Sequence, residues 1–545
     1  MNAEDFIKNE LSLFLKKHEI ELPVILQRPK DENHGDFASN LAMQLARHLK
    51  KNPRQIAEEI ISTISLNDSY ISKAEIAGPG FINFYAATGN ILDQFLQIPK
   101  LQSEFGRIKQ SNPIKAQVEF VSANPTGPLT IGHGRQAVLG DTVANILEAA
   151  GYDVTREYYF NDAGRQMRVL GESVKIRYQQ LCGLEIELSD DHYQGEYIID
   201  IAKDLHQHHG DALKNDNDLE KFTKAAEDTI FENIKGTIKK LGFKFDVFFN
   251  EKSLYEQGKI DQVIKDLKTK NLVYENEGAT WFKTTDLGFD QDRVIIKSSG
   301  EPTYRLPDMA YHVEKFKRKF ELIVDIFGAD HIDTYPDVLA ALKVLGYDEE
   351  KVKVLIHQFV TLTNKGEQVK MSTRKANFVT LDELIEDVGV DVTRYFFLMR
   401  GMNTHLNFDL SLAKTQSDEN PVFYIQYAHA RICSIIALAE SKNINTKNHK
   451  RDILENLVKK EETNLIKELL QFPEIVKICS QVLEPQRMVN YLFGLAATFH
   501  RFYTECRVIT EDENLSMARL ALIDGTRIVI ANALHILGIS APNKM

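Results

Sequence analysis

The chain has 545 residues, of which 43% are hydrophobic and 26% are charged. At about 150 residues per domain this length predicts three or four domains, each with its own core, and the composition excludes a disordered chain. Lysine and arginine number 66 against 78 aspartates and glutamates, so the net charge is −12. This charge excludes a general attraction to nucleic acid or to an anionic membrane, so any polyanion must meet a local basic face.

Four scattered cysteines, Cys182, Cys433, Cys479 and Cys506, form no C-x-x-C pair. This spacing favours a reducing compartment over a zinc ribbon or a disulfide framework. The first residues lack the basic segment and apolar core of a secretory signal, and the longest apolar stretch, 528–539, is too short to span a bilayer. We therefore expect a cytoplasmic protein with no membrane partner and no tightly bound metal.

The first 108 residues predict a small α+β domain. An amphipathic helix at 6–17 opens this domain, and a strand at 80–85 follows the turn Gly78-Pro79.

Residues 109–394 predict a Rossmann-type, doubly wound parallel sheet, an α/β fold. Helical segments separate short apolar runs at 116–121, 154–160, 294–296, 322–327 and 352–356. The polar stretch at about 185–251 predicts helices that are inserted into this domain and do not join its core.

Residues 395–545 predict an all-α helical bundle. The strand pattern ends at about residue 391, and the apolar residues beyond it recur with a helical period.

A loop rich in glycine and proline joins the first strand of the parallel sheet to its first helix, over Ser122-Ala123-Asn124-Pro125-Thr126-Gly127-Pro128-Leu129-Thr130-Ile131-Gly132-His133. Nucleotides bind at this place in open parallel sheets, because a helix N-terminus offers free N–H groups and a positive dipole. Gly132 and Gly134 let a ligand approach the backbone, and His133 offers a ring N–H to an oxygen. A tight structural turn explains the small residues equally well, and no Walker sequence follows.

A basic segment, Lys370-Met371-Ser372-Thr373-Arg374-Lys375, is the second candidate. Cations on a loop neutralise the charge that builds on leaving pyrophosphate during adenylyl transfer. Taken alone, the segment is explained better as a solvated basic loop.

Together the two segments resemble the H-I-G-H and K-M-S-K-S signatures of class I aminoacyl-tRNA synthetases, here as Thr130-Ile131-Gly132-His133 and Lys370-Met371-Ser372-Thr373-Arg374. Stretches in all three regions resemble the arginyl-tRNA synthetase family, among them Gly35-Asp36-Phe37-Ala38-Ser39-Asn40, Glu301-Pro302-Thr303-Tyr304 and Gly538-Ile539-Ser540-Ala541-Pro542. The resemblance implies that ATP, accompanied by Mg²⁺, activates arginine to arginyl-adenylate. The arginyl group then passes to the 3′-terminal adenosine of tRNA(Arg), and we expect a monomer.

The resemblance also implies the residues that act on ATP. It assigns catalysis to Thr130, His133, Lys370, Met371, Ser372, Arg374 and Lys375, and ATP binding to Pro128, Thr130, Gly132, His133 and Lys370. Asp330 is a further candidate for ATP binding because it follows the run 322–327 at the carboxyl end of a predicted strand, and a structural turn explains it equally well. Thr130 stands where the signature has its first histidine, and Thr373 stands where it has its second lysine. We expect Arg374 or Lys375 to supply part of the missing charge.

For arginine, the resemblance implies a site made of Glu119, Ser122, Asn124, Tyr304 and Asp308. A planar cation with five N–H donors is best met by a carboxylate. We expect Asp308 to bind the guanidinium and Asn124 to bind the α-amino or carboxylate end. Tyr304 and Asp308 are spaced for one face of a helix turn, although Pro307 predicts an irregular helix.

For tRNA, the resemblance implies contacts through Asn40 in the first region and Tyr424, Gln426, Tyr427 and His429 in the last. Aromatic rings and polar edges suit splayed single-stranded bases. Each of the last four is equally well explained as part of the bundle core.

Two other functions stay open. One is a class I enzyme that activates cysteine, although such enzymes carry a set of cysteine and histidine zinc ligands that this sequence lacks. A silent RNA-binding paralogue is the other, since Thr130 and Thr373 depart from the signatures. His206, His208 and His209 cluster without a nearby cysteine or acidic set in the sequence, which favours a solvated helix over a metal site.

Overall fold

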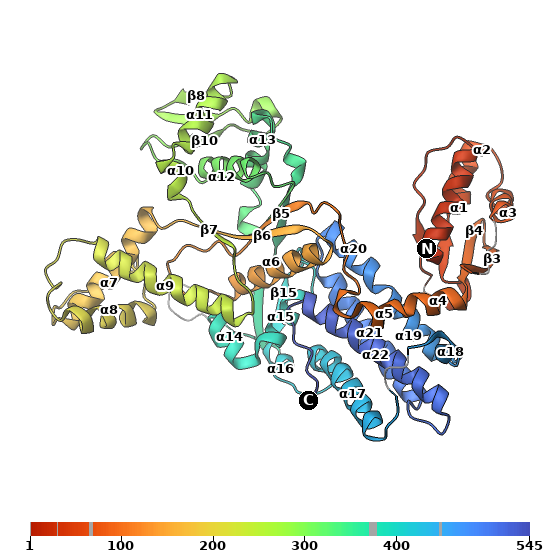
Figure 1. Ribbon diagram of the computed structural model, residues 1–545. Helices are drawn as coiled ribbons and strands as arrows, with labels where there is room; N and C mark the ends of the chain where they lie inside the picture. Colours follow the sequence, from red (N-terminus) through yellow and green to blue (C-terminus); the bar gives the residue numbers. More distant parts are fainter. Residues whose placement is uncertain (1, 30, 65–68, 370–378, 446–448) are drawn as a thin grey trace.

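The computed structural model describes residues 2–29, 31–64, 69–369, 379–445 and 449–545. Three regions follow one another along the chain: a small N-terminal domain at one side, a central α/β domain, and a set of C-terminal helices between them (Figure 1).

The N-terminal region is an α+β domain, as predicted. Its antiparallel sheet has the strand order β1-β2-β4-β3, and α1 buries one apolar face that includes Phe6, Leu11 and Phe14. Its elements are α1 (Ala3–Lys17), β1 (Leu26–Gln27), β2 (Phe37–Ser39), α2 (Leu41–Leu49), α3 (Pro53–Thr63), β3 (Ile71–Ala77) and β4 (Phe81–Ala86), followed by α4 (Thr88–Phe95) and α5 (Gln97–Leu101).

The centre of the molecule is a five-stranded parallel sheet with the order β12-β11-β5-β6-β7. Counted along the chain this is the order 5-4-1-2-3, which reverses direction between β5 and β11. Ligands of doubly wound sheets bind at such a reversal, beyond the carboxyl ends of the strands. The strands are β5 (Lys115–Glu119), β6 (Asp153–Phe160), β7 (Val247–Asn250), β11 (Leu322–Gly328) and β12 (Val352–His357).

Helices cover both faces of this sheet (Figure 1). One face packs Val118, Phe120 and Ile326 against α6, so closely that a Cβ at Gly140 would lie 2.1 Å from the Phe120 ring. The other face carries α12 and α13. The predicted doubly wound fold is therefore confirmed, and its helices are α6 (Ile131–Ala149), α7 (Gly164–Leu181), α8 (Glu196–His209), α9 (Glu220–Lys240), α10 (Lys252–Glu256), α11 (Lys259–Thr269), α12 (Arg305–Lys317) and α13 (Tyr335–Leu345).

Three expectations about strands need correction. The run 294–296 lies in β10 (Arg293–Ile296) of a separate antiparallel sheet with β9 (Ala279–Phe282) and β8 (Val273–Asn276), because the β8–β9 hairpin supplies its partner. The stretch 185–251 contains β7, an edge strand of the parallel sheet, and its helices bury residues such as Phe222 and Ile230 in the main core.

Strands also continue beyond residue 391. β15 (Leu406–Asp409) pairs in parallel with β13 (Val360–Asn364), which also pairs with β14 (Glu367–Gln368). Near this sheet lie α14 (Leu381–Val388), α15 (Val390–Leu398) and α16 (Leu410–Ala413).

The C-terminal helices form a bundle, as predicted, and its apolar core is continuous with that of the α6 side of the sheet. One helix, α17, has the length and composition to cross a membrane, but half of its most apolar window is buried inside the protein. The helices are α17 (Pro421–Ser441), α18 (Arg451–Leu454), α19 (Lys460–Leu470), α20 (Phe472–Val482), α21 (Gln486–Glu505) and α22 (Glu513–Ile536).

Candidate active site

The loop after β5 begins with a strained backbone. Val121 and Ser122 have φ values of 68° and 43°, in the left-handed region that a β-branched residue rarely adopts. The turn directs the Ser122 hydroxyl back to Glu119 Oε1 at 2.9 Å, and the same hydroxyl accepts the Tyr159 N–H at 3.2 Å. Ser122 thereby ties the ends of two neighbouring strands together.

Thr130 is the N-cap of α6. Its hydroxyl accepts the His133 N–H at 3.5 Å, and His133 Nδ1 accepts the Thr130 N–H at 3.2 Å, so the two residues cap each other. Nothing in the described protein needs Gly132 to be small, since a Cβ there would meet only Thr130 Oγ1 at 3.7 Å. A Cβ at Gly134 would instead lie 2.5 Å from Leu381.

The basic segment lies outside the described residues, so the structure places none of Lys370, Met371, Ser372, Arg374 and Lys375. Its C-terminal flank is placed: Thr380 pairs with Thr130, and the Leu381 N–H donates to the Leu129 carbonyl at 2.9 Å. The chain thus returns from this segment to the N-terminus of α6. The side chain of Asp330 also lies outside the described part of the protein.

Three carboxylates stand abreast on the α12 face of the parallel sheet. The register places Glu119 of β5 between Asp325 of β11 and Glu157 of β6, and all three are buried. We call Glu119, Glu157 and Asp325 the acidic row. Such a row is unstable without compensating charge.

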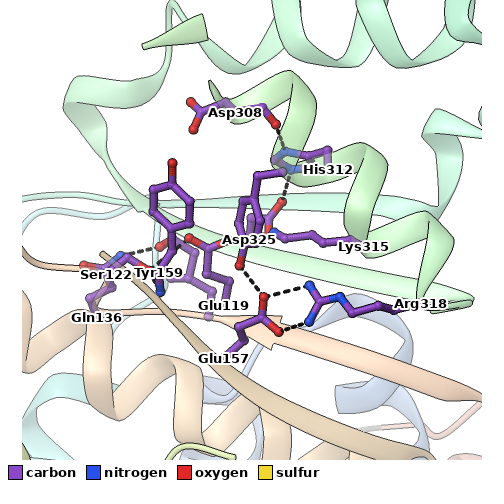
Figure 2. A network of polar contacts seen from close by, with 12 residues as sticks. Glu119, Ser122, Gln136, Glu157, Tyr159, Asp308, His312, Lys315, Arg318 and Asp325 are labelled. Atoms are coloured by element: carbon purple, nitrogen blue, oxygen red, sulfur yellow. Dashed lines mark hydrogen bonds and ion pairs between the residues drawn. The ribbon is translucent and has the colours of Figure 1, made fainter. Parts of the chain in front are cut away.

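Helix α12 supplies that charge from one stripe of side chains, as Figure 2 shows. Lys315 Nζ lies 2.6 Å from both Glu119 Oε2 and Asp325 Oδ1, and His312 Nε2 lies 2.8 Å from Asp325 Oδ2. Arg318 holds both oxygens of Glu157, at 2.5 and 2.7 Å.

The cations and carboxylates of this network reinforce each other's charge. Burial disfavours charge on Lys315 and Asp325, but their attraction outweighs it, raising the pKa of Lys315 and lowering that of Asp325. Burial raises the pKa of Glu119, so this carboxylate depends most on the shared ammonium.

Asp308 continues the same stripe of α12 toward the carboxyl ends of the strands. It lies in the first turn of the helix, where Pro307 causes no break because the N–H groups of a first turn need no partner in the helix. No described residue donates a hydrogen bond to the half-buried Asp308 carboxylate. Burial, with help from the Glu119 and Glu251 carboxylates, raises its pKa to about 7.

Tyr159 and Glu251 belong to the same site, although sequence reasoning missed both. The Tyr159 hydroxyl donates to Glu251 Oε2 at 2.6 Å, and Asn161 Nδ2 donates to Glu251 Oε1 at 2.8 Å. Burial, with the nearby carboxylates of Asp308 and Glu251, raises the pKa of Tyr159 well above its usual value. No described cation forms an ion pair with Glu251. The sequence signal that could have identified Glu251 is its place directly after the strand 247–250, at the carboxyl end where ligands bind.

The other residues expected to bind arginine lie around this cluster. Asn124 Oδ1 accepts the Asn161 N–H at 3.0 Å, and Asn124 Nδ2 donates to Gln166 at 3.0 Å. Tyr304 occupies the N-cap position of α12, one turn before Asp308, and 81% of its surface is exposed. Glu119, in contrast, is only 4% exposed and forms the floor of the cluster.

Two residues named as candidates for tRNA contact, Gln426 and His429, are buried within the protein, which favours the bundle-core explanation for both. Gln426 Nε2 donates to Asp391 at 2.8 Å and to the Ser540 carbonyl at 2.9 Å, and His429 Nδ1 lies 2.9 Å from the Pro542 carbonyl. Both therefore hold the C-terminal tail against α17.

The remaining tRNA candidates lie nearer the surface. Tyr427 is 43% exposed, while Tyr424 is partly buried against His500, with ring centroids 4.5 Å apart. Asn40 precedes α2 and accepts a hydrogen bond from Gln44 at 3.1 Å.

The prediction that no cysteine or carboxylate accompanies the histidine group is wrong. Ligand atoms of Cys182, His206 and Asp211 lie within 4.8 Å of one another, because a turn after α8 returns to the end of α7. A hydrogen bond of 3.1 Å between His206 Nε2 and Asp211 accounts for part of this contact. His208 and His209 are exposed, as expected.

This fold and the loop after β5 define a class I aminoacyl-tRNA synthetase. The family model described as "tRNA synthetases class I (R), catalytic domain" matches residues 97–397. The models for the arginyl tRNA synthetase N terminal domain and the DALR anticodon binding domain match residues 2–86 and 425–545.

Full-length relatives narrow the class to one family. The chain is 51% identical to the arginine–tRNA ligase of Desulfotalea psychrophila, covering 95% of this chain and 94% of the relative. It is 50% identical to that of Chlorobium phaeobacteroides, covering 97% and 98%. The solved arginyl-tRNA synthetase of Thermus thermophilus shares the fold, with a TM-score of 0.78, 23% identity and 99% of both chains covered. The chain belongs to the arginyl-tRNA synthetase family, and it is an ATP-dependent arginine–tRNA ligase.

Proposed function

We propose that this ligase holds the guanidinium of arginine at Asp308, with Glu251 and the Tyr159 hydroxyl completing the site. The single observation that carries the proposal is a pair of carboxylates, Asp308 and Glu251, that flank Tyr159 and form no ion pair with a described cation. An arriving cation compensates both. Tyr304 covers the guanidinium from the exposed side, as its place one turn before Asp308 suggests.

The α-amino or carboxylate end of arginine binds near Ser122 and Asn124, and Glu119 supports this end from below. This direction places the arginine carboxylate beside the N-terminus of α6, where ATP is expected. The carboxylate attacks the α-phosphorus directly, so the protein has to position the reactants and stabilise charge.

ATP binds over the N-terminus of α6, with Pro128, Thr130, Gly132 and His133 on one side and Asp330 on the other. The open space beside Gly132 supports a close approach of the nucleotide. Lys370, Arg374 and Lys375 would neutralise the charge of the leaving pyrophosphate, Met371 and Ser372 belong to the same catalytic segment, and Mg²⁺ would accompany ATP and supply further positive charge. The return of the chain from this segment to Thr130 supports that role.

The three regions divide the work on tRNA(Arg). Residues 1–108 form an accessory tRNA-binding domain that includes Asn40, residues 109–394 carry the catalysis, and residues 395–545 bind the anticodon. Tyr427 is a base-stacking candidate because its ring is exposed, and Tyr424 supports it. The protein acts as a cytoplasmic monomer.

ATP–pyrophosphate exchange tests the proposal. The assay uses arginine, lysine and citrulline, each with and without total tRNA, on the wild-type protein and on Asp308→Asn. Of the three amino acids, only arginine should support exchange by the wild type. Asp308→Asn should raise the arginine KM about a hundredfold, because it removes the charge that faces the guanidinium. The ATP KM should stay within about twofold.

Each contrary outcome identifies the part of the proposal that fails. Wild-type arginine affinity in Asp308→Asn would remove Asp308 from the site. A rise in the ATP KM as large as the rise in the arginine KM would mean that Asp308 does not act on arginine specifically.

A further inference from the structure

The acidic row is paired with side chains of the α12 stripe. The carboxylates Glu119, Glu157 and Asp325 face His312, Lys315 and Arg318. Both ring nitrogens of His312 face acceptors. Nε2 meets the Asp325 carboxylate, and Nδ1 lies 2.8 Å from the Asp308 carbonyl.

Lys315 is the centre of this arrangement. Its side chain is completely buried, and its ammonium has three N–H groups to satisfy. Two carboxylates lie 2.6 Å away, and the centroid of the Tyr311 ring lies 4.3 Å away. The ammonium is therefore held in one place and holds the Glu119 carboxylate in turn.

Glu119 is fixed at both oxygens. Lys315 binds Oε2, and the Ser122 hydroxyl binds Oε1 from the strained turn of the loop. Any shift of this carboxylate is transmitted to Ser122, whose hydroxyl also accepts the Tyr159 N–H. His312 similarly connects Asp325 to the backbone of the Asp308 turn.

We propose that Lys315 is a positioning residue for arginine: it fixes Glu119, and through Ser122 and Tyr159 it sets the floor on which the substrate lies. The inference rests on the arginine site proposed above. It also fits the selection of a cation at Asp308 and Glu251, because Lys315 and Arg318 are already paired with the acidic row and form no ion pair with these two carboxylates.

The test compares Lys315→Met with Arg318→Met as a matched control. Both variants remove a cation of α12 from one member of the acidic row, but Arg318 binds Glu157, which has the Tyr311 hydroxyl as a further partner at 2.6 Å. Both should lower the Tm. Lys315→Met should raise the arginine KM about tenfold or more while the ATP KM and kcat stay within about twofold, and Arg318→Met should leave the arginine KM within about twofold.

A double variant separates positioning from stability, and it replaces the single variant should that one fail to fold. Lys315→Met with Asp325→Asn removes one charge of each sign, so its Tm should recover toward that of the wild type. Its arginine KM should stay about tenfold high, because Glu119 still lacks its anchor. Asp308→Asn is measured beside it as the reference for the arginine site.

Three results would overturn the proposal. An arginine KM near the wild-type value in Lys315→Met is the first, an equal rise in Arg318→Met is the second, and recovery of the arginine KM together with the Tm in the double variant is the third. Should Asp308→Asn keep wild-type arginine affinity, the arginine site itself fails. Should Asp308→Asn alone raise the KM, only the role of Lys315 fails.

Discussion

Two buried clusters of charged residues differ in whether residues of the protein itself supply a partner for every charged group. At the joint of α6, α15 and the C-terminal tail, all three guanidinium nitrogens of Arg394 have acceptors: Asp141 at 2.5 Å and the carbonyls of Leu537 and Leu241 at 2.8 and 3.0 Å. On the α12 face of the parallel sheet, the acidic row is paired with His312, Lys315 and Arg318, but the Asp308 carboxylate receives no hydrogen bond from a described residue. A complete cluster stabilises the fold, whereas an incomplete one attracts a ligand.

The largest effect is expected at the complete cluster. Arg394→Met leaves Asp141 partly uncompensated in a buried place, which should cost about 3–5 kcal/mol of unfolding free energy. The arginine KM of the folded fraction should not change, because Arg394 does not face the site. Urea denaturation measures the first quantity and exchange kinetics the second.

An exposed pair provides the control for Arg394. Arg487 and Glu484 lie 2.6 Å apart with 50% and 40% of their side chains exposed. Arg487→Met should change the unfolding free energy by about 0–1 kcal/mol. A similar loss in both variants would mean that the burial of Arg394 is not what makes it important.

The next largest effect is expected from Glu251→Gln, at the incomplete cluster. The substitution keeps the shape that meets Tyr159 and Asn161 but removes one negative charge near the guanidinium. The arginine KM should rise between about tenfold and a hundredfold, with little loss of Tm. A loss of Tm with an unchanged KM would instead place Glu251 among the structural carboxylates.

A smaller effect is expected from pH. With its pKa raised to about 7, Asp308 gains a proton as the pH falls through 7 and loses its attraction for the guanidinium. The apparent arginine KM should therefore rise about tenfold between pH 8 and pH 6. Glu119, Glu251, Tyr159, His312 and Lys315 surround the carboxylate, so Asp308→Asn is the control: its arginine KM should be flat over this range.

Local patterns were enough to predict the frame of the site. The strand, loop and helix at residues 115–149 follow from an apolar run, a glycine-rich loop and a helical period, and the spacing of Tyr304 and Asp308 follows from one helix turn. These predictions need only neighbours in sequence.

The acidic row was missed because strand register is a tertiary property. Glu119, Glu157 and Asp325 each interrupt an apolar strand, but only the pairing of β11, β5 and β6 places them abreast. The sequence left open whether Gln426 and His429 face tRNA or the bundle core for a similar reason. Apolar residues surround much of α17, so periodicity does not show which side faces the C-terminal tail.

The smallest effect is expected at Thr130, the first departure from the signatures. Its substitution distinguishes a hydroxyl that caps the helix from one that contacts the nucleotide. Its hydroxyl already caps α6 together with His133, so it has a partner within the protein. Thr130→Ala should therefore cost about 1 kcal/mol of unfolding free energy, and Thr130→Ser, which keeps the hydroxyl, should cost less. Urea denaturation and the ATP KM in pyrophosphate exchange are the two measurements. A raised ATP KM beside this loss of stability would show that the same hydroxyl also serves the nucleotide, as proposed for the ATP site. An unchanged ATP KM would limit Thr130 to the helix cap, because a cap that matters only to the fold changes stability without changing the affinity for ATP.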